Sequence, residues 1–179
     1  MKTTKIDIDL DLDEFDEEVT ALIPDLISNR TTSRQNARLK LSEINLRVLD
    51  QIAKLIESKN KQLRWEVAKS FEDRASSDSM PILLQLLADE ESDIRWIAAV
   101  SLINIGRESI IPLLHEIIHH ESTSICEGAH HVLNSLLTGK EKHKFRRLMK
   151  TLKHNKAVKG VASVNAKELL DSLNSSDHL

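Results

Sequence analysis

The sequence predicts an all-α fold, an α-solenoid of about five stacked helical hairpins. Its 179 residues are rich in Leu, Ile, Val and Ala but include only four Gly, three Pro and no Tyr, a composition that favours helices over sheets with tight turns. One segment also recurs at a constant spacing of 31 residues, as LRWEVAKSF from Leu63, IRWIAAVSL from Ile94 and ICEGAHHVL from Ile125. A fixed period of this length indicates a repeat architecture.

The hairpins are expected between residues 17 and 173. A looser copy of the repeat, offset by 61 residues from one of the later units, supplies the first hairpin, in which Pro24 should kink or split the first helix. In the central units the first segment, such as PILLQLL from Pro81, opens with a proline, which suits the first helical turn. The second segment runs from Asp93, an expected N-cap, to Gly106, a helix terminator.

The last hairpin is expected to use FRRLMKTL from Phe145 as its first helix and AVKGVASVNAKELL from Ala157 as its second. One hairpin cannot bury its apolar side alone, so neighbouring hairpins must stack, and the second helices should line a concave surface. The predicted organisation is an acidic N-terminal arm, residues 1–16, a solenoid, residues 17–175, with a basic C-terminal repeat from about residue 140, and a disordered tail, residues 176–179.

The pattern D-x-R-W-x-A-A-x-x-L-x-x-I-G, from Asp93 to Gly106, resembles the second helix of HEAT repeats. The short unit is similar to the HEAT-like repeats of phycobilisome lyase subunits and deoxyhypusine hydroxylase. The resemblance implies a HEAT-like superhelix and a non-catalytic scaffold or adaptor that binds another protein. A bilin lyase or lyase-like chromophore chaperone is the alternative that it implies. The hydroxylase activity is not carried over, because the positions of that family's iron-binding His-Glu pairs hold none here, namely Trp65-Glu66, Trp96-Ile97 and Glu127-Gly128.

Charge is distributed unevenly along the chain, although the formal net charge is only -3. Residues 1–29 hold nine acidic residues and two lysines, whereas residues 140–159 hold nine Lys or Arg and one acid, Glu141. The basic stretch predicts an amphipathic helix that is either a solvated face or a contact for an acidic protein. Nucleic acid is less favoured, because the chain is slightly acidic and this stretch lacks base-stacking aromatics. The candidate electrostatic contacts are Lys144, Arg146, Arg147, Lys150 and Lys153.

The N-terminal segment KIDIDLDLDEFDEE, from Lys5, alternates apolar and acidic residues like a half-buried strand, yet an all-helical body offers no sheet for it. We interpret it as a flexible acidic arm that leads into the first helix. The alternative is an arm that adds as a strand to a partner or docks on a basic surface.

Trp65 and Trp96 are repeat equivalents, and on a helical wheel each points away from the main core stripe. Together with Val100 and Ile103 they predict a protein-binding patch, because Trp dominates interface energetics. The alternative is that the two indoles bury each other. The resemblance also implies that the repeated arginines pair with acids or carbonyls of the adjacent turn and are structural; these are Arg34, Arg64 and Arg95.

The motif His-Glu-x-x-His at His115, Glu116 and His119 places two imidazoles on one side of a helix, as in zinc proteases. We reject a metal site, because the nearby candidates for a third ligand, Glu121, His130 and His131, follow no zinc-protease spacing. We therefore expect no catalytic residue, no metal and no cofactor.

Cys126 is the only cysteine, which excludes an intramolecular disulfide and favours a reducing compartment. We predict a cytoplasmic protein without a membrane partner, since the sequence has neither a signal sequence nor the roughly 20 apolar residues that span a bilayer.

Overall fold

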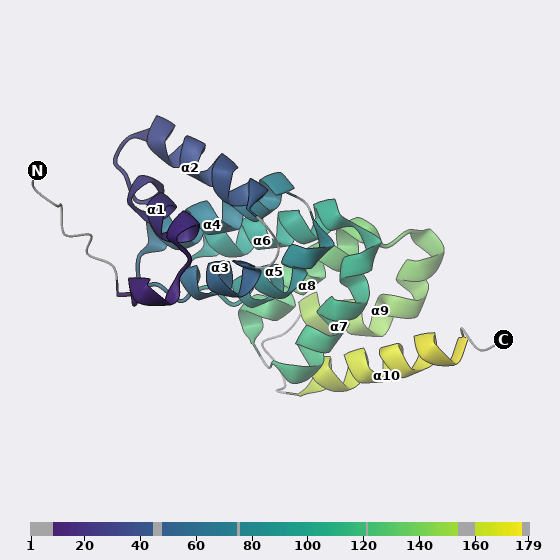
Figure 1. Cartoon of the computed structure of the whole chain (residues 1–179). Coiled ribbons are helices and arrows are strands. Elements are labelled where there is room, and N and C mark those ends of the chain that lie inside the picture. The colour runs from purple at the N-terminus through teal and green to yellow at the C-terminus, as the bar shows by residue number, and fades with distance from the viewer. Residues whose placement is uncertain (1–8, 45–47, 75, 121, 154–159, 177–179) are drawn as a thin grey trace, which may run out of the picture. The chain divides into compact units, whose positions relative to one another are not determined.

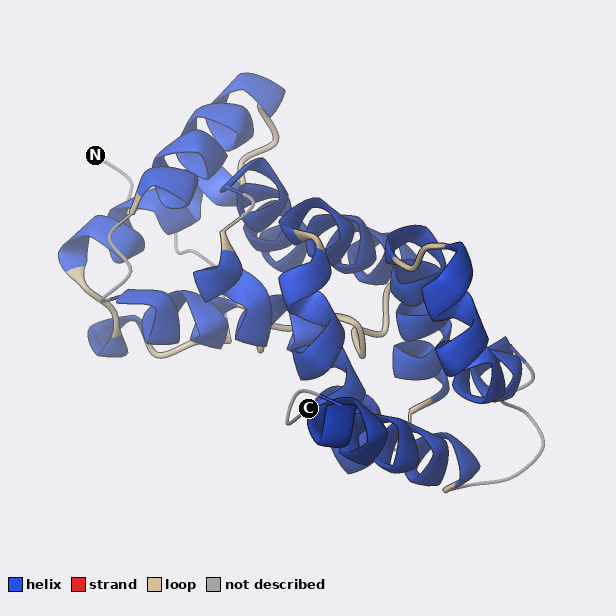
Figure 2. Cartoon of the chain, turned by 90° about the vertical axis from the view of Figure 1, so that its right-hand side faces the viewer, coloured by secondary structure: helices blue, strands red, loops and turns tan. Residues whose placement is uncertain are grey.

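The computed structural model describes residues 9–44, 48–74, 76–120, 122–153 and 160–176. Within these ranges the chain forms ten α-helices and no strand (Figures 1 and 2). The fold class is therefore the predicted one, an all-α solenoid of helical hairpins. Contacts divide the chain into two compact units, Met1–Ser79, here unit 1, and Met80–Leu179, here unit 2. A single solenoid domain over residues 17–175 stays a prediction, and Ala157, where we expected the last helix to begin, lies outside the described residues.

Unit 1 contains two helical hairpins. Helix α1 packs on α2, and α4 packs on α1, α2 and α3, so that α4 is the central helix of this unit. Its core includes the fully buried side chains of Val19, Ile23, Leu63 and Phe71. The elements are η1 (Leu12–Glu14), α1 (Glu17–Leu26), α2 (Thr31–Glu43), α3 (Leu49–Leu55), α4 (Lys61–Arg74) and η3 (Ser77–Ser79).

Pro24 does not split α1, so the split helix, one of the two predicted outcomes, is wrong. The helix continues through Pro24 and ends at Leu26. The ring of Pro24 is exposed, and the one helical hydrogen bond that a proline here cannot donate is the bond to the carbonyl of Thr20. A proline this close to the end of a helix interrupts only the last turn.

Unit 2 contains the clearest repeats. Helix α5 packs on α6, α7 packs on α8, and the two second helices α6 and α8 pack on each other. Pro81 lies in the first turn of α5, as predicted. The elements are α5 (Met80–Leu86), α6 (Ser92–Ile105), η4 (Arg107–Ser109), α7 (Ile110–His119), α8 (Thr123–Leu136), α9 (Gly139–Lys153) and α10 (Val161–Ser176).

The ends of α6 were predicted with mixed success. Asp93 is not the N-cap, because α6 begins at Ser92 and its N-cap is Glu91. Asp93 lies in the first turn, and its Oδ1 accepts a hydrogen bond from the backbone N–H of Ile94 at 3.2 Å. The C-terminal end is where the sequence indicated it, since Gly106 has φ 92° and ψ -147°, a conformation open almost only to glycine.

The last hairpin is reversed relative to the prediction. Helix α9 packs on α8, in the layer of second helices, and α10 packs on α7, in the layer of first helices (Figure 1). Two side-chain contacts fix α10: Ser163 Oγ donates to the carbonyl of Ile118 at 2.8 Å, and Asn165 Nδ2 donates to Thr151 Oγ1 at 2.8 Å. Phe145 therefore belongs to a helix of the second layer.

The repeated arginines have the structural role that the resemblance implied. In each case Nη1 donates to the carbonyl of the residue six positions earlier, at the end of the preceding turn. Arg34 bonds to Ser28 at 2.7 Å, Arg64 to Ser58 at 2.8 Å and Arg95 to Asp89 at 2.8 Å. Each arginine thus ties the start of a second helix to the connection that leads into it. Cys126 takes this position in the next repeat and is buried.

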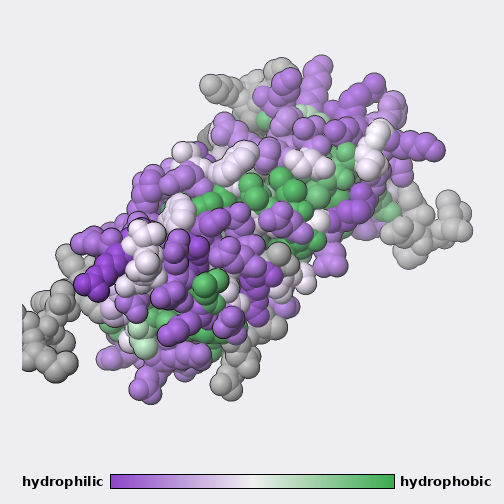
Figure 3. Space-filling model, turned by 90° about the horizontal axis from the view of Figure 1, so that it is seen from above, coloured by the Kyte–Doolittle hydropathy of each residue, from purple (hydrophilic) through white to green (hydrophobic). Residues whose placement is uncertain are grey.

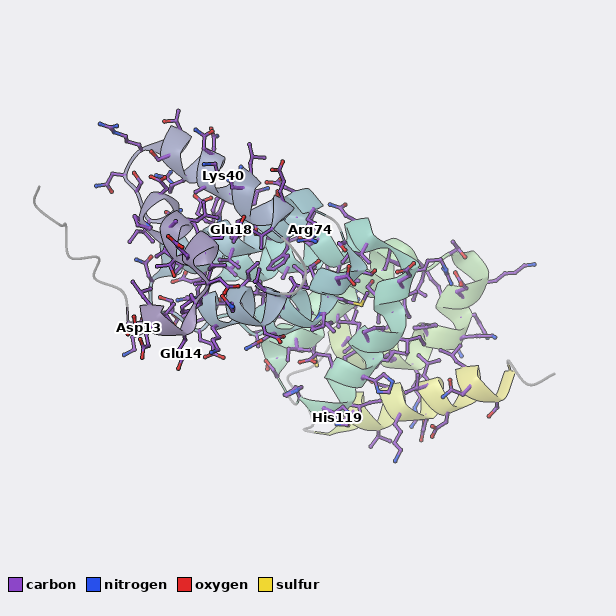
Figure 4. The ribbon with its side chains drawn as sticks, in the orientation of Figure 1. Asp13, Glu14, Glu18, Lys40, Arg74 and His119 are labelled. Atoms are coloured by element: carbon purple, nitrogen blue, oxygen red, sulfur yellow. The ribbon has the colours of Figure 1, made fainter. Side chains whose placement is uncertain are left out.

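The described part of the acidic arm, residues 9–16, lies against α3 and the turn after it in unit 1, so the expectation of a flexible arm is wrong for these residues. The carboxylate of Asp9 accepts hydrogen bonds from Ser58 Oγ at 2.8 Å and from the backbone N–H of Lys59, and these bonds lower the pKa of Asp9. Glu14 pairs with Lys54 of α3 at 2.6 Å. Figure 4 shows Asp13 and Glu14 at this corner of the unit. Residues 1–8 and the end of the predicted tail, 177–179, lie outside the described residues.

Candidate functional site

The two tryptophans have different surroundings. Trp96, on α6 of unit 2, is 57 % exposed, the largest exposed fraction among the large apolar side chains of the described chain. Trp65, on α4 of unit 1, is half-buried. A patch shared by the two indoles stays a prediction, because they belong to different units. Figure 3 shows one face of the molecule, on which areas of apolar surface lie among hydrophilic side chains.

Trp96 contacts a ring that we did not predict as its partner. Its ring lies 4.6 Å from the ring of His131 on α8, centroid to centroid, with 35° between the two planes. Val100 and Ile103, four and seven residues after Trp96, lie on the same side of α6 and are half-buried. We call these four residues, Trp96, Val100, Ile103 and His131, the Trp96 patch. The repeat contained the signal for His131, since it is the equivalent of Val100 one period later.

A basic edge borders the Trp96 patch. His130, next to His131 in α8, is partly buried, and burial lowers its pKa, with further lowering from the charges of Lys153 and His131. Lys153 of α9 is therefore close enough to α8 to repel a proton on His130. Lys142 of α9 also reaches α8, where its Nζ donates to Asn134 Oδ1 at 3.4 Å. Positive charge from α9 thus lies beside the second-helix layer of unit 2.

The predicted cations of α9 have different neighbours. All five are exposed, and Phe145, Leu148 and Leu152 bury the opposite side of the helix, as an amphipathic helix requires. Arg147 Nη1 pairs with Glu168 Oε2 of α10 at 2.5 Å. Lys144 instead lines a pocket near the beginning of α9. Any binding role of Lys144, Arg146, Arg147, Lys150 and Lys153 stays a prediction.

The His-Glu-x-x-His motif lies on α7, whereas the Trp96 patch lies on α6 and α8. His115 and His119 are exposed and their rings stack, with centroids 6.4 Å apart; Figure 4 shows His119 at the end of α7, beside α10. Glu116 is half-buried and lies 3.7 Å from His120 Nε2. In the described part of the chain no group of three His, Cys, Asp or Glu is placed to hold a metal ion, and Glu121 lies outside that part.

Among the helices that the structure describes, none is by itself both long enough and apolar enough to cross a membrane. One pair, Ser92–Ile105 with Arg107–His119, reaches that length and apolar composition only when taken together, and it is bent by 117°.

The repeated hairpins, their 31-residue period and the arginine at the start of successive second helices define an α-helical repeat protein. A family model described as HEAT repeats matches residues 34–144, more than half of the chain, and the chain belongs to this family. Comparison with curated proteins found no match, and comparison with solved structures found none either. HEAT repeats commonly form protein-interaction scaffolds, and the family is generally non-catalytic.

Proposed function

We propose that this protein is a non-catalytic scaffold or adaptor that binds another protein through the second-helix face of unit 2, with Trp96 as the anchor. The observation that carries the proposal is the exposure of Trp96, which is 57 % accessible although it belongs to a helix whose other side is fully buried. A large apolar side chain exposed in this way loses contact with water only when a partner covers it.

The support of the indole favours a binding role. The His131 ring lies against the Trp96 ring at a 35° tilt, and Val100 and Ile103 extend the apolar area along α6, so the indole has contacts that restrict it before a partner arrives. An anchor held in its bound position loses little conformational entropy on binding. Tryptophans at the centre of an apolar area surrounded by polar residues are the usual hot spots of protein interfaces.

The chemistry of the edge indicates the kind of partner. Lys142 and Lys153 place positive charge beside α8, next to the Trp96 patch. A partner that fits this surface carries an apolar pocket for the indole and acidic side chains beside it, because complementary charge speeds association and excludes basic competitors. Nucleic acid stays the less favoured partner, because the chain is slightly acidic and its basic stretch lacks base-stacking aromatics.

A pull-down from the native extract, followed by titration of the recovered partner, tests the proposal. Trp96→Ala should raise the dissociation constant about 30-fold or more, because removal of a hot-spot residue costs about 2 kcal/mol of binding free energy. Val164→Ala is the matched control, because Val164 is also an exposed apolar residue, 54 % accessible, but lies on α10 outside the patch.

Equal affinity of wild type and Trp96→Ala for every recovered partner would reject the patch as the binding site. Loss of affinity in Val164→Ala as well as in Trp96→Ala would move the site away from the second-helix face.

A bilin lyase or chromophore chaperone of the phycobilisome type stays the alternative that the resemblance suggested. Incubation with free bilin and an apo-phycobiliprotein, followed by absorbance spectroscopy, tests it. A cytoplasmic location is part of the same proposal and is checked by fractionation of the native cells.

A further inference from the structure

A pocket of about 460 Å³ lies within unit 2, and no residue of the Trp96 patch lines it. It opens where the first turns of α7 and α9 meet the last turns of α10. Its apolar lining comes from Ile110 and Ile111 of α7, Phe145 of α9 and Leu173 of α10. Ile110 and Phe145 are buried, whereas Ile111 is 41 % exposed. The volume falls within the range of about 300–1,000 Å³ that small-molecule sites occupy.

The charged lining of the pocket is positive on balance. Arg107 and Glu141 pair with each other through two hydrogen bonds, one of them 3.1 Å long between Arg107 Nη1 and Glu141 Oε2. Thr138 holds the same carboxylate, with its N–H at 3.1 Å and its Oγ1 at 2.6 Å from Glu141 Oε2. Glu141 is thus fully engaged in neutralising Arg107.

Two further cations, Lys140 and Lys144, line the same pocket. Both are exposed, and neither has a hydrogen-bond or ion-pair partner among the residues that the structure describes. They are four residues apart on α9, so their side chains project from the same side of the helix. The pocket therefore combines an apolar lining with two ammonium groups that form no ion pair with the described residues of unit 2.

From this combination we infer that the pocket binds a small amphipathic organic anion, a ligand with a carboxylate or phosphate head group and an aliphatic body. The aliphatic body packs on Ile110, Ile111, Phe145 and Leu173, and the head group lies between the ammonium groups of Lys140 and Lys144. Burial of an aliphatic chain supplies most of the binding free energy, since each CH₂ removed from water contributes about 0.8 kcal/mol. The two lysines select an anion over a neutral or cationic molecule of the same length.

Titration of the full chain with dodecanoate and with dodecyl phosphate, followed by calorimetry and by NMR of isoleucine methyl groups, tests the inference. We expect saturable binding of one molecule with a dissociation constant on the order of 10–100 µM, and shifts of the Ile110 and Ile111 methyl signals. Comparison of the two ligands distinguishes a carboxylate from a phosphate head group. Dodecanol and dodecylammonium should bind at least about tenfold more weakly, because they cannot pair with the lysines.

The double variant Lys140→Gln/Lys144→Gln should weaken dodecanoate binding about tenfold, and Ile111→Ser should also weaken it, by about threefold to tenfold. All three residues are exposed, so the variants should fold, which far-UV circular dichroism checks. The matched control is Lys142→Gln/Lys153→Gln, which removes the same charge from the same helix outside the pocket and should bind dodecanoate like the wild type.

The inference is overturned if dodecanoate does not bind, if dodecylammonium binds equally well, or if the two lysine double variants behave alike. The peptide DIDLDLDE, residues 7–14 of this chain, serves as a further probe. Binding of this peptide without binding of dodecanoate would overturn the small ligand in favour of an acidic segment of a second copy. Trp96→Ala should bind dodecanoate like the wild type. Failure of the ligand pocket and failure of the proposed protein-binding patch can therefore be distinguished.

Discussion

Glu66 is the buried charge on which the packing of α2 against α4 depends. It is 1 % exposed, and its two carboxylate oxygens accept hydrogen bonds from Arg34 Nε at 3.0 Å and Arg38 Nη1 at 3.1 Å, both from α2. Gln62 Nε2 donates to the same group at 3.0 Å. Replacement of Glu66 by Gln keeps the shape of the side chain but removes the charge, and it turns one acceptor into a donor that faces a guanidinium.

The loss of stability in Glu66→Gln depends on which contacts Arg34 and Arg38 keep. Breaking a buried ion pair by removing one partner typically costs about 3–5 kcal/mol. Here Arg34 and Arg38 are 21 % and 16 % exposed, so water reaches part of each guanidinium. Arg38 also keeps its ion pair with Asp73 at 3.0 Å. We therefore expect Glu66→Gln to lower the free energy of unfolding by about 2–4 kcal/mol, at the lower end of the range for buried pairs.

Urea denaturation followed by far-UV circular dichroism measures this loss, and hydrogen exchange of the α2 amides shows whether it is confined to that helix. The matched control is Glu72→Gln, which removes a carboxylate of the same helix that pairs with Lys69 while both side chains keep about a quarter of their surface exposed. A pair of this kind contributes only about 0–1 kcal/mol. If Glu66→Gln is no more destabilising than Glu72→Gln, the carboxylate of Glu66 does not hold α2 on α4.

Three further outcomes are expected. Gly128→Val should destabilise the protein by about 1–3 kcal/mol in urea denaturation, because a Cβ at Gly128 lies only 2.7 Å from Leu87 Cδ2 and further methyl groups increase the overlap. Gly106→Ala should cost about 1–3 kcal/mol in the same assay, since φ 92° strains any other residue, and an unchanged midpoint would contradict the strain. Arg107 and two hydrogen bonds from the preceding turn lower the pKa of Glu141 from 4.5 to about 2. A carboxyl whose pKa is lower in the folded state stabilises that state fully above pH 4.5, and this stabilisation is lost as the pH falls through about 2. The difference in stability between wild type and Glu141→Gln should therefore shrink over that interval.

The fold was predictable because the repeat constrains it at many positions at once. Equivalent small residues stand where helices approach closely, and Val67, Ala98 and Ala129 are all fully buried. The repeated arginines bond to carbonyls six residues earlier, a contact that recurs because the local backbone recurs. Periodicity therefore indicates local structure well wherever the period is kept.

The errors occur where the period does not determine the outcome. Asp93 was expected to be the N-cap because of its residue type, but α6 begins one residue earlier. The order of α9 and α10 depends on which layer the apolar side of each helix covers. The sequence indicates where the apolar side of each helix is, but not which other helix packs on it. Pro24 is tolerated because α1 ends soon after it. The residue at which a helix ends is harder to predict from a sequence than the presence of the helix.

The candidate site was predictable in part. Exposure of Trp96 followed from its place on the helical wheel, whereas its contact with His131 depends on how α6 and α8 pack. The pocket was not predictable, because Arg107, Lys140 and Leu173 come from three elements far apart in the sequence. No local pattern brings such residues together.

The reversed order of α9 and α10 affects where a further repeat would find a matching neighbour. A further copy of the 31-residue unit placed ahead of Gly139 meets a neighbour of its own kind and leaves the terminal pair intact. A copy added after α10 would instead meet a helix that packs on α7, in the layer of first helices.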